Sequence, residues 1–292
     1  MVQMFSKCLI CDSGSLVDLV GYEKDYLVRC KNCSFVFSKA VATYEDLQTE
    51  YLSTYTRSDD ISPITLSRYP GLLDHFEKYR ANNNIIDVGA GNGHFIKAAK
   101  DRGWNVFGTE FDERAVKICE DKGIIMHSGK LDVNNYKPGF FDVITSFEVI
   151  EHINNPQEEI ASFNKILRVG GVTYITTPNV NSISRYFLKG KWTVFNYPEH
   201  LSYYSPGTLN RVFTQSGFKN VSLNTTGINY DRFVKSLQVK SRIVNSYNTE
   251  TIRENSERKM LWKFAKKFIN LLLNLTRKGD KIKAEFVKIK SL

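Results

Sequence analysis

The sequence predicts an α/β protein, in which a mostly parallel sheet has helices on both faces and follows a small cysteine-rich module. Three observations predict it. Short apolar segments alternate with amphipathic ones from residue 85 onward, a glycine-rich loop follows the first apolar segment, and four of the five cysteines lie within the first 33 residues. The 292 residues, 42% hydrophobic and 24% charged, suit one full-sized globular domain with an accessory module.

Residues 1–42 carry two Cys-x-x-Cys pairs, Cys8 with Cys11 and Cys30 with Cys33, separated by 18 residues. Two such pairs at this distance are typical of a zinc site. Four thiolates close the zinc tetrahedron, so a structural zinc in a zinc ribbon-like module is expected. A redox function explains the pattern less well, because it does not require two matched pairs.

Residues 43–84 are expected to form a lid and a leading helix over residues 63–80. Strands and helices then alternate through a core of residues 85–232. The expected strands cover residues 85–89, 105–110, 124–127, 141–147, 172–177 and 220–226, and the expected helices 94–102, 113–122, 156–167 and 206–216.

The loop Asp87-Val-Gly89-Ala-Gly91-Asn-Gly93 lies between the first strand and the following helix. Glycine lets the backbone approach a ligand closely. The G-x-G-x-G spacing differs from the G-x-G-x-x-G of nicotinamide and flavin binders and from a P-loop. The second strand ends at Glu110, 23 residues after Asp87, where a carboxylate can accept hydrogen bonds from both ribose hydroxyls of an adenosine ligand.

In this context the chain resembles a class I S-adenosylmethionine (SAM)-dependent methyltransferase of the ubiquinone/sugar-methyltransferase-like group. Five segments match in order between residues 44 and 232: IIDVGAGNGHF, GTEFDERAVKICEDKGI, FDVITSFEVIEHINNP, ILRVGGVTYITTPN and EHLSYYSPGTLNRVFTQSGF. The resemblance implies a Rossmann-like sheet of seven strands and SAM as the cofactor.

The resemblance also implies where SAM binds. Asp87, Gly89 and Gly91, in the loop that Gly93 completes, would surround its methionine part, and Glu110 would hold the ribose. The remaining expected cofactor contacts are Phe111 beside the adenine, Lys130 and Leu131 at the adenine edge, and Phe147 and Glu148 from the fourth strand.

Methyl transfer to a hydroxyl needs a base, and histidine is the usual choice near neutral pH. His152 follows the fourth strand and His200 the fifth, and a glutamate precedes each of them. The carboxyl ends of the strands are where open α/β sheets bind ligands. Both histidines are therefore candidate catalytic residues, with a structural hydrogen-bonding role as the alternative for each.

Residues 233–280 are expected to form a basic helical insertion before the last strand of the core sheet, over residues 281–292. Residues 235–292 hold 15 Lys and Arg against 5 Asp and Glu, whereas the rest of the chain holds 25 against 26. Over residues 258–275 a mostly basic polar stripe lies opposite an apolar one. This pattern fits either contact with an anionic membrane surface or a helix docked on the core with solvated lysines.

These features predict a SAM-dependent methyltransferase that methylates a hydroxyl of a sugar, nucleotide-sugar or glycolipid, as polysaccharide biosynthesis would require. The alternatives are an RNA methyltransferase and a non-enzymatic zinc- and SAM-binding regulator. The near-neutral body disfavours nucleic acid, and the intact glycine loop and the histidines disfavour a regulator. No signal-peptide pattern and no apolar run of about 18 residues is visible, so a cytoplasmic protein is expected, with peripheral membrane contact as a further expectation. The sequence leaves the oligomeric state open.

Overall fold

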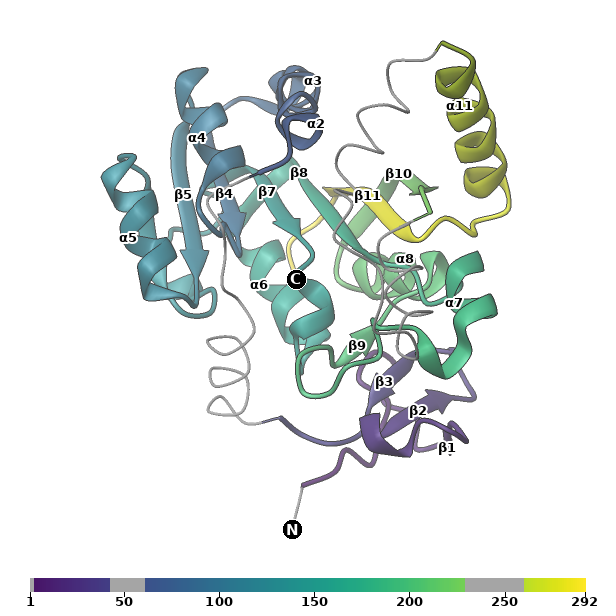
Figure 1. Cartoon of the computed structure of the whole chain (residues 1–292). Helices are drawn as coiled ribbons and strands as arrows, with labels where there is room; N and C mark the ends of the chain where they lie inside the picture. The colour runs from purple at the N-terminus through teal and green to yellow at the C-terminus, as the bar shows by residue number, and fades with distance from the viewer. Residues whose placement is uncertain (1–2, 43–60, 229–259) are drawn as a thin grey trace.

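A computed structural model describes residues 3–42, 61–228 and 260–292, and its largest element is a seven-stranded sheet in the order β10-β11-β8-β7-β4-β5-β6 (Figure 1). Five strands are parallel: β4 (Asn84–Val88), β5 (Asn105–Glu110), β6 (Ile125–Ser128), β7 (Phe141–Phe147) and β8 (Leu167–Pro178). The last strand, β11 (Lys281–Lys288), runs antiparallel between β8 and β10 (Phe218–Thr226). The predicted Rossmann-like sheet is confirmed.

Helices cover both faces of this sheet. Apolar residues of α3 (Tyr69–Phe76), α4 (His94–Asp101) and α5 (Glu113–Asp121) form one core cluster with the first face. Residues of α6 (Pro156–Ile166) and α8 (Pro206–Gln215) form another with the second face. In α4 the buried residues are Phe95, Ile96 and Ala99, whose helical spacing places them on one side.

The leading helix differs from the expectation of one helix over residues 63–80. It consists of α2 (Pro63–Leu66), α3 and a 3-10 turn over Glu77–Tyr79. Pro70 has no amide hydrogen to donate to the carbonyl of Leu66, which explains the interruption. Residues 43–60 of the predicted lid and residues 229–259 of the predicted insertion lie outside the described residues.

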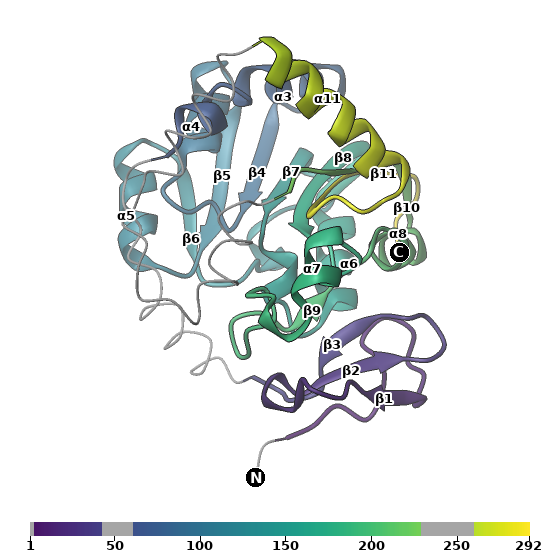
Figure 2. The same cartoon turned by 45° about the vertical axis from the view of Figure 1, so that its right-hand side comes forward.

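The cysteine-rich module shares a sheet with the large domain. Its strands β1 (Leu16–Asp18), β2 (Leu27–Cys30) and β3 (Val36–Ser38) are joined by β9 (Ser202–Tyr203), and Figure 2 shows the module beside β9. Phe35 of the module packs on Tyr204, with ring centroids 5.2 Å apart, within a core cluster that includes α6 and α8 residues. The sequence did not predict β9 or this shared core.

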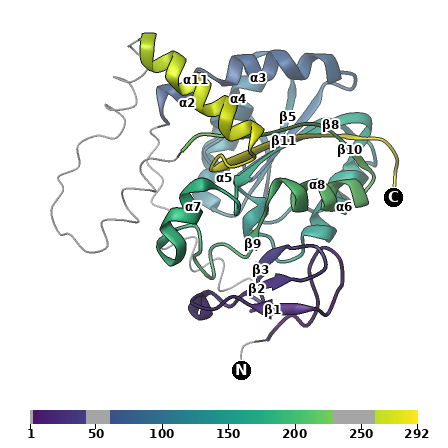
Figure 3. The same ribbon diagram turned by 90° about the vertical axis from the view of Figure 1, so that its right-hand side faces the viewer.

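Helix α11 (Met260–Leu275) lies at the edge of the sheet beside β10, at the opposite end of the molecule from the cysteine-rich module (Figure 3). It docks through polar side chains: Asn274 accepts a hydrogen bond from the amide of Thr225 (2.9 Å), and Asn270 one from the amide of Gly227 (2.8 Å). Both asparagines belong to the polar stripe of residues 258–275, so part of that stripe faces the sheet edge. No helix in the described ranges is long and apolar enough to cross a bilayer.

Candidate functional site

A cavity of about 770 Å³ opens at the carboxyl ends of β4, β7 and β8, a size typical of a small-molecule site. Five of the predicted cofactor residues line it: Asp87, Gly89, Gly91, Phe147 and Glu148. The site therefore lies at the sheet edge where the parallel strands end, as expected for this class of sheet.

The glycine loop has backbone conformations that glycine adopts readily. Gly89 has φ of +75°, and a Cβ added there would lie 2.4 Å from Cγ2 of Val149. Gly93 also has a positive φ, but its hypothetical Cβ would lie 2.6 Å from Sγ of Cys119. Gly93 does not line the cavity, and the structure gives it a packing role; its predicted cofactor contact stays a prediction.

Glu110 ties the glycine loop to the end of β5. Its carboxylate is buried and accepts hydrogen bonds from the amides of Gly91 and Phe111, both at 2.8 Å. Glu110, Phe111, Lys130 and Leu131 do not line the cavity, so their contacts with the nucleoside stay predictions. Glu110 nevertheless lies beside the Gly91 amide, a position compatible with a ribose bound between the glycine loop and the end of β5.

Asp87 is buried beneath the loop and accepts a hydrogen bond from Oγ1 of Thr145 at 2.7 Å. Burial, together with the charge of Glu110, raises the pKa of Asp87 to about 8, against the opposing effect of the Thr145 hydrogen bond. The carboxyl group is thus mostly protonated at neutral pH. A ligand ammonium placed beside it would favour the ionised form, which suits the amino group of a bound methionine moiety.

Glu148, directly after β7, has two features of a functional residue. Its φ is +55°, an uncommon conformation outside glycine, and its buried Oε1 has no hydrogen-bond partner among the residues that the structure describes. Its Oε2 lies 3.4 Å from Nζ of Lys281. The sequence predicted Glu148 as a site residue, but no sequence signal predicted its strained backbone.

His152 and His200 lie side by side, with ring centroids 4.7 Å apart. Nδ1 of His152 lies 2.6 Å from the carbonyl oxygen of Glu199, and Nδ1 of His200 lies 2.7 Å from that of Val194. Because a carbonyl oxygen only accepts hydrogen bonds, each Nδ1 carries the hydrogen and each neutral ring has its basic lone pair on Nε2.

Glu151 completes this histidine cluster. It is buried, and it accepts a hydrogen bond from Oγ1 of Thr177 at 2.9 Å. Burial and the charge of Glu148 raise the pKa of Glu151, while burial lowers the pKa of His152. Ligand atoms of Glu151, His152 and His200 lie within 4.8 Å of one another, so the group can serve acid–base chemistry or hold a metal ion. None of the three lines the cavity, although Glu148 does.

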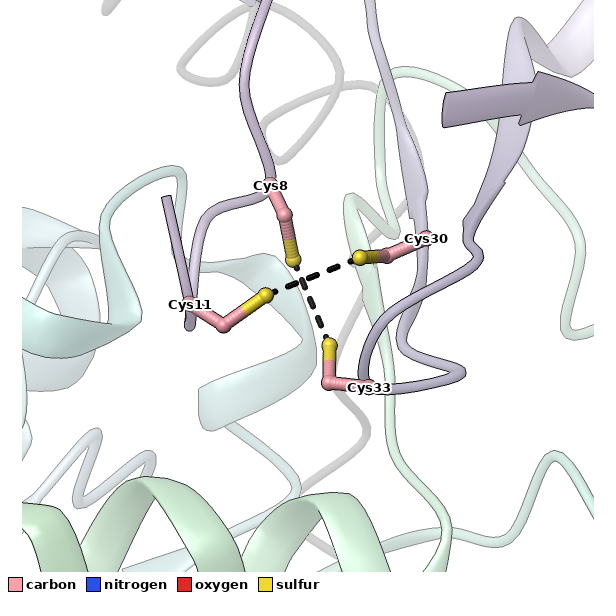
Figure 4. Close-up of side chains that lie close together, drawn as sticks. All are labelled: Cys8, Cys11, Cys30 and Cys33. Carbon is pink, nitrogen blue, oxygen red and sulfur yellow. Dashed lines mark hydrogen bonds between the residues drawn. The ribbon is translucent and has the colours of Figure 1, made fainter. Parts of the chain in front are cut away.

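The four predicted metal-ligating cysteines converge on one point (Figure 4). Sγ of Cys8 lies 3.5 Å from Sγ of Cys33, and Sγ of Cys11 lies 3.6 Å from Sγ of Cys30. A tetrahedral zinc with Zn–S bonds of about 2.3 Å sets its sulfur atoms about 3.8 Å apart. All four are free thiols and all four sulfur atoms lie within 4.8 Å of one another, so the cluster has the donor set and the spacing of a structural zinc site.

Comparison with known proteins is consistent with this geometry. A family model for methyltransferase domains matches residues 66–223, more than half of the chain. The chain is similar to the ubiquinone biosynthesis O-methyltransferase of Thiobacillus denitrificans, with 26% identity over 188 residues that cover 60% of this chain and 80% of the relative. The enzyme of the same name from Idiomarina loihiensis is 24% identical over 181 residues, covering 56% and 71%.

Two solved structures are also similar. A SAM-dependent methyltransferase from Archaeoglobus fulgidus superposes with a TM-score of 0.53 and 18% identity, covering 84% of this chain and 100% of the other. Phosphoethanolamine N-methyltransferase 2 from Haemonchus contortus, in complex with SAM, gives a TM-score of 0.53 and 17% identity, covering 87% and 62%. At these identities the likeness shows the fold.

Proposed function

The chain belongs to the methyltransferase-domain family and is a class I SAM-dependent methyltransferase, and on that basis we propose that it methylates a hydroxyl group of a small-molecule acceptor. The main support for this proposal is the pair formed by His152 and His200. Their hydrogen bonds through Nδ1 put the basic lone pair of each ring on Nε2. The relatives named as O-methyltransferases support oxygen as the acceptor atom.

Within this class we propose a sugar, nucleotide-sugar or glycolipid acceptor. The relatives are named for ubiquinone biosynthesis, so an aromatic hydroxyl is the competing acceptor. The relatives described above do not support a role in polysaccharide biosynthesis, which therefore rests on the sequence pattern.

Bound SAM supplies a methyl group that its sulfonium has already activated. The glycine loop and Asp87 would hold the methionine part, Glu110 would hold the ribose, and the cavity walls would exclude water. Aligning the acceptor oxygen with the methyl group is mainly a proximity effect. His200, supported by His152 beside it, would accept the hydroxyl proton at Nε2 as the carbon–oxygen bond forms.

Cys8, Cys11, Cys30 and Cys33 would hold a structural zinc. Four thiolates leave no open coordination position, so the metal would stabilise the module and take no part in methyl transfer. A segment of about 40 residues has too small a core to fold alone, and zinc would supply the missing stability.

A methyl-transfer assay tests the acceptor class. The protein is incubated with methyl-labelled SAM and, in separate reactions, nucleotide-sugars, glycolipids, catechols and total RNA. The proposal requires a labelled methyl ether on a sugar hydroxyl. A methyl ether on a catechol would retain O-methylation but reject the sugar class, and label on nitrogen, on carbon or in RNA would reject the proposed function.

We also propose that α11 contacts an anionic membrane. Because Asn270 and Asn274 face β10, the helix leaves apolar side chains in solvent: Phe268 is 61% exposed, Leu272 45% and Leu275 72%. Lys267 in the middle of the helix and Arg277 and Lys278 just after its end are exposed basic residues. Apolar residues flanked by cations are complementary to the interface of a bilayer that contains anionic lipids.

Sedimentation with vesicles tests this contact. We expect binding to phosphatidylserine-containing vesicles, with affinity lowered about tenfold or more in the Phe268→Ser, Leu275→Ser double variant, because two side chains lose their apolar burial. Val221→Ser, at an exposed apolar residue of β10, is the matched control. Equal binding by the double variant would contradict the proposal, as would a concentration-dependent dimer that the double variant abolishes.

A further inference from the structure

We propose that Arg68, Lys281 and Lys283 form a subsite in the cavity for an anionic group of the acceptor, with the charge of a phosphate or pyrophosphate. This inference deepens the proposed function and rests on its placement of SAM and acceptor. Neither lysine was among the site residues predicted from the sequence. The sequence shows them only as polar residues that alternate with apolar ones in the expected last strand.

The described residues give the cavity wall an unbalanced charge. Its three cations come from Arg68 at the start of α3 and from two residues of β11 that point to the same face. The carboxylates in the lining are Glu148, which pairs with Lys281 at 3.4 Å, and Asp87, which is mostly protonated at neutral pH. Among the lining residues that the structure describes, and with SAM absent, one ionised carboxylate therefore opposes three cations.

The cations also repel one another. Lys283 is partly buried, and its burial, together with the charges of Arg68 and Lys281, lowers its pKa. An anion bound between the three cations would relieve this repulsion. It would accept hydrogen bonds from side chains whose backbone is already fixed in β11 and at the start of α3. A phosphate, with several acceptor oxygens, can use all three donors at once.

The position of the cations favours the acceptor over the cofactor. Thr176 of β8 pairs with Phe147 of β7 on one side and with Lys283 of β11 on the other, so these three residues form one row across the sheet. Neighbouring strands lie about 4.8 Å apart, which puts the backbone of Lys283 about 10 Å from Phe147 and about 14 Å from strand β4, whose glycine loop is to hold SAM. An anionic group held on this side of the cavity, away from strand β4, fits the phosphates of a nucleotide-sugar or of a phosphate-linked glycolipid.

Calorimetric titration with inorganic pyrophosphate and, separately, with SAM tests the subsite. In Lys283→Gln and Lys281→Gln we expect the dissociation constant of pyrophosphate to rise about fivefold or more, because each loses a charged hydrogen-bond donor, while that of SAM changes less than about twofold. Lys117→Gln is the matched control, since Lys117 lies on α5, is largely exposed and pairs with Asp121 outside the cavity.

Three outcomes would overturn the inference. The first is no pyrophosphate binding by the unchanged protein, and the second is an equal loss in Lys117→Gln. The third is weaker SAM binding with unchanged pyrophosphate binding, which would assign the cations to the carboxylate of SAM. The acceptor assay is independent of this titration: label on nitrogen would reject the proposed function while a lysine-dependent pyrophosphate site remained.

Discussion

His200→Ala is expected to lower the turnover number about 10²–10⁴-fold while the dissociation constant of SAM changes less than about twofold. The hydroxyl proton must leave as the methyl group is transferred, and His200 is proposed to accept it. The hydrogen bond from Nδ1 to the carbonyl of Val194 fixes the tautomer that this role needs. Because the predicted SAM contacts come from β4, β5 and β7 and from the loop after β6, removing the imidazole leaves them in place.

Initial rates and SAM calorimetry on three variants measure this effect. His200→Gln keeps a hydrogen-bonding side chain without a base, and His127→Ala, on the distant edge strand β6, is the matched control. Loss of less than about threefold in both His200 variants would show that His200 is not the base. Turnover that requires an added divalent ion would instead assign Glu151, His152 and His200 as metal ligands, since their ligand atoms lie within 4.8 Å of one another.

Cys30→Ser is expected to release the metal, to lower the free energy of unfolding by about 3 kcal/mol or more, and to reduce turnover as well. The loss of turnover follows from the fold. The Ser38 amide donates to the Leu201 carbonyl at 2.8 Å, and the Leu201 amide donates to the Glu151 carbonyl at 2.8 Å. Strand β3 thus supports the segment that carries His200, so unfolding of the module should displace the histidine cluster.

Elemental analysis, thermal denaturation and rate measurements on the same preparation test this expectation. The unchanged protein should contain one zinc per chain, and Cys119→Ser, a buried thiol outside the cluster, should keep it. Metal-free protein with two disulfides after purification under reducing conditions would contradict the zinc assignment. Unchanged turnover in metal-free Cys30→Ser would show that the module does not support the histidines.

The sheet and the glycine loop could be predicted from the sequence because their signals are local. Asp87 to Gly93 places a strand end, a loop and a helix start within a few residues, and each has a distinctive composition. Glu148 was predicted by resemblance, yet its φ of +55° depends on how the chain leaves β7 and has no local signal.

Contacts between distant segments could not be predicted. Strand β9 has two residues, Ser202 and Tyr203, too few for any periodicity, and it exists because β3 pairs with it. Asn270 and Asn274 appear in the sequence only as members of a polar stripe. A helical pattern does not reveal that they accept hydrogen bonds from the amides of Thr225 and Gly227 at the end of β10. Lys283 enters the cavity only when β11 is placed beside β8.

Calorimetric titration of the purified protein with SAM tests directly whether the glycine loop and Glu110 bind this cofactor. We expect saturable binding at one site per chain, and a dissociation constant about tenfold or more higher in Glu110→Ala, because the proposed ribose hydrogen bonds have a charged acceptor. Glu120→Ala, on α5 outside the cavity, is the matched control and should bind SAM normally. Absence of SAM binding by the intact, zinc-loaded protein would contradict its assignment as a SAM-dependent methyltransferase.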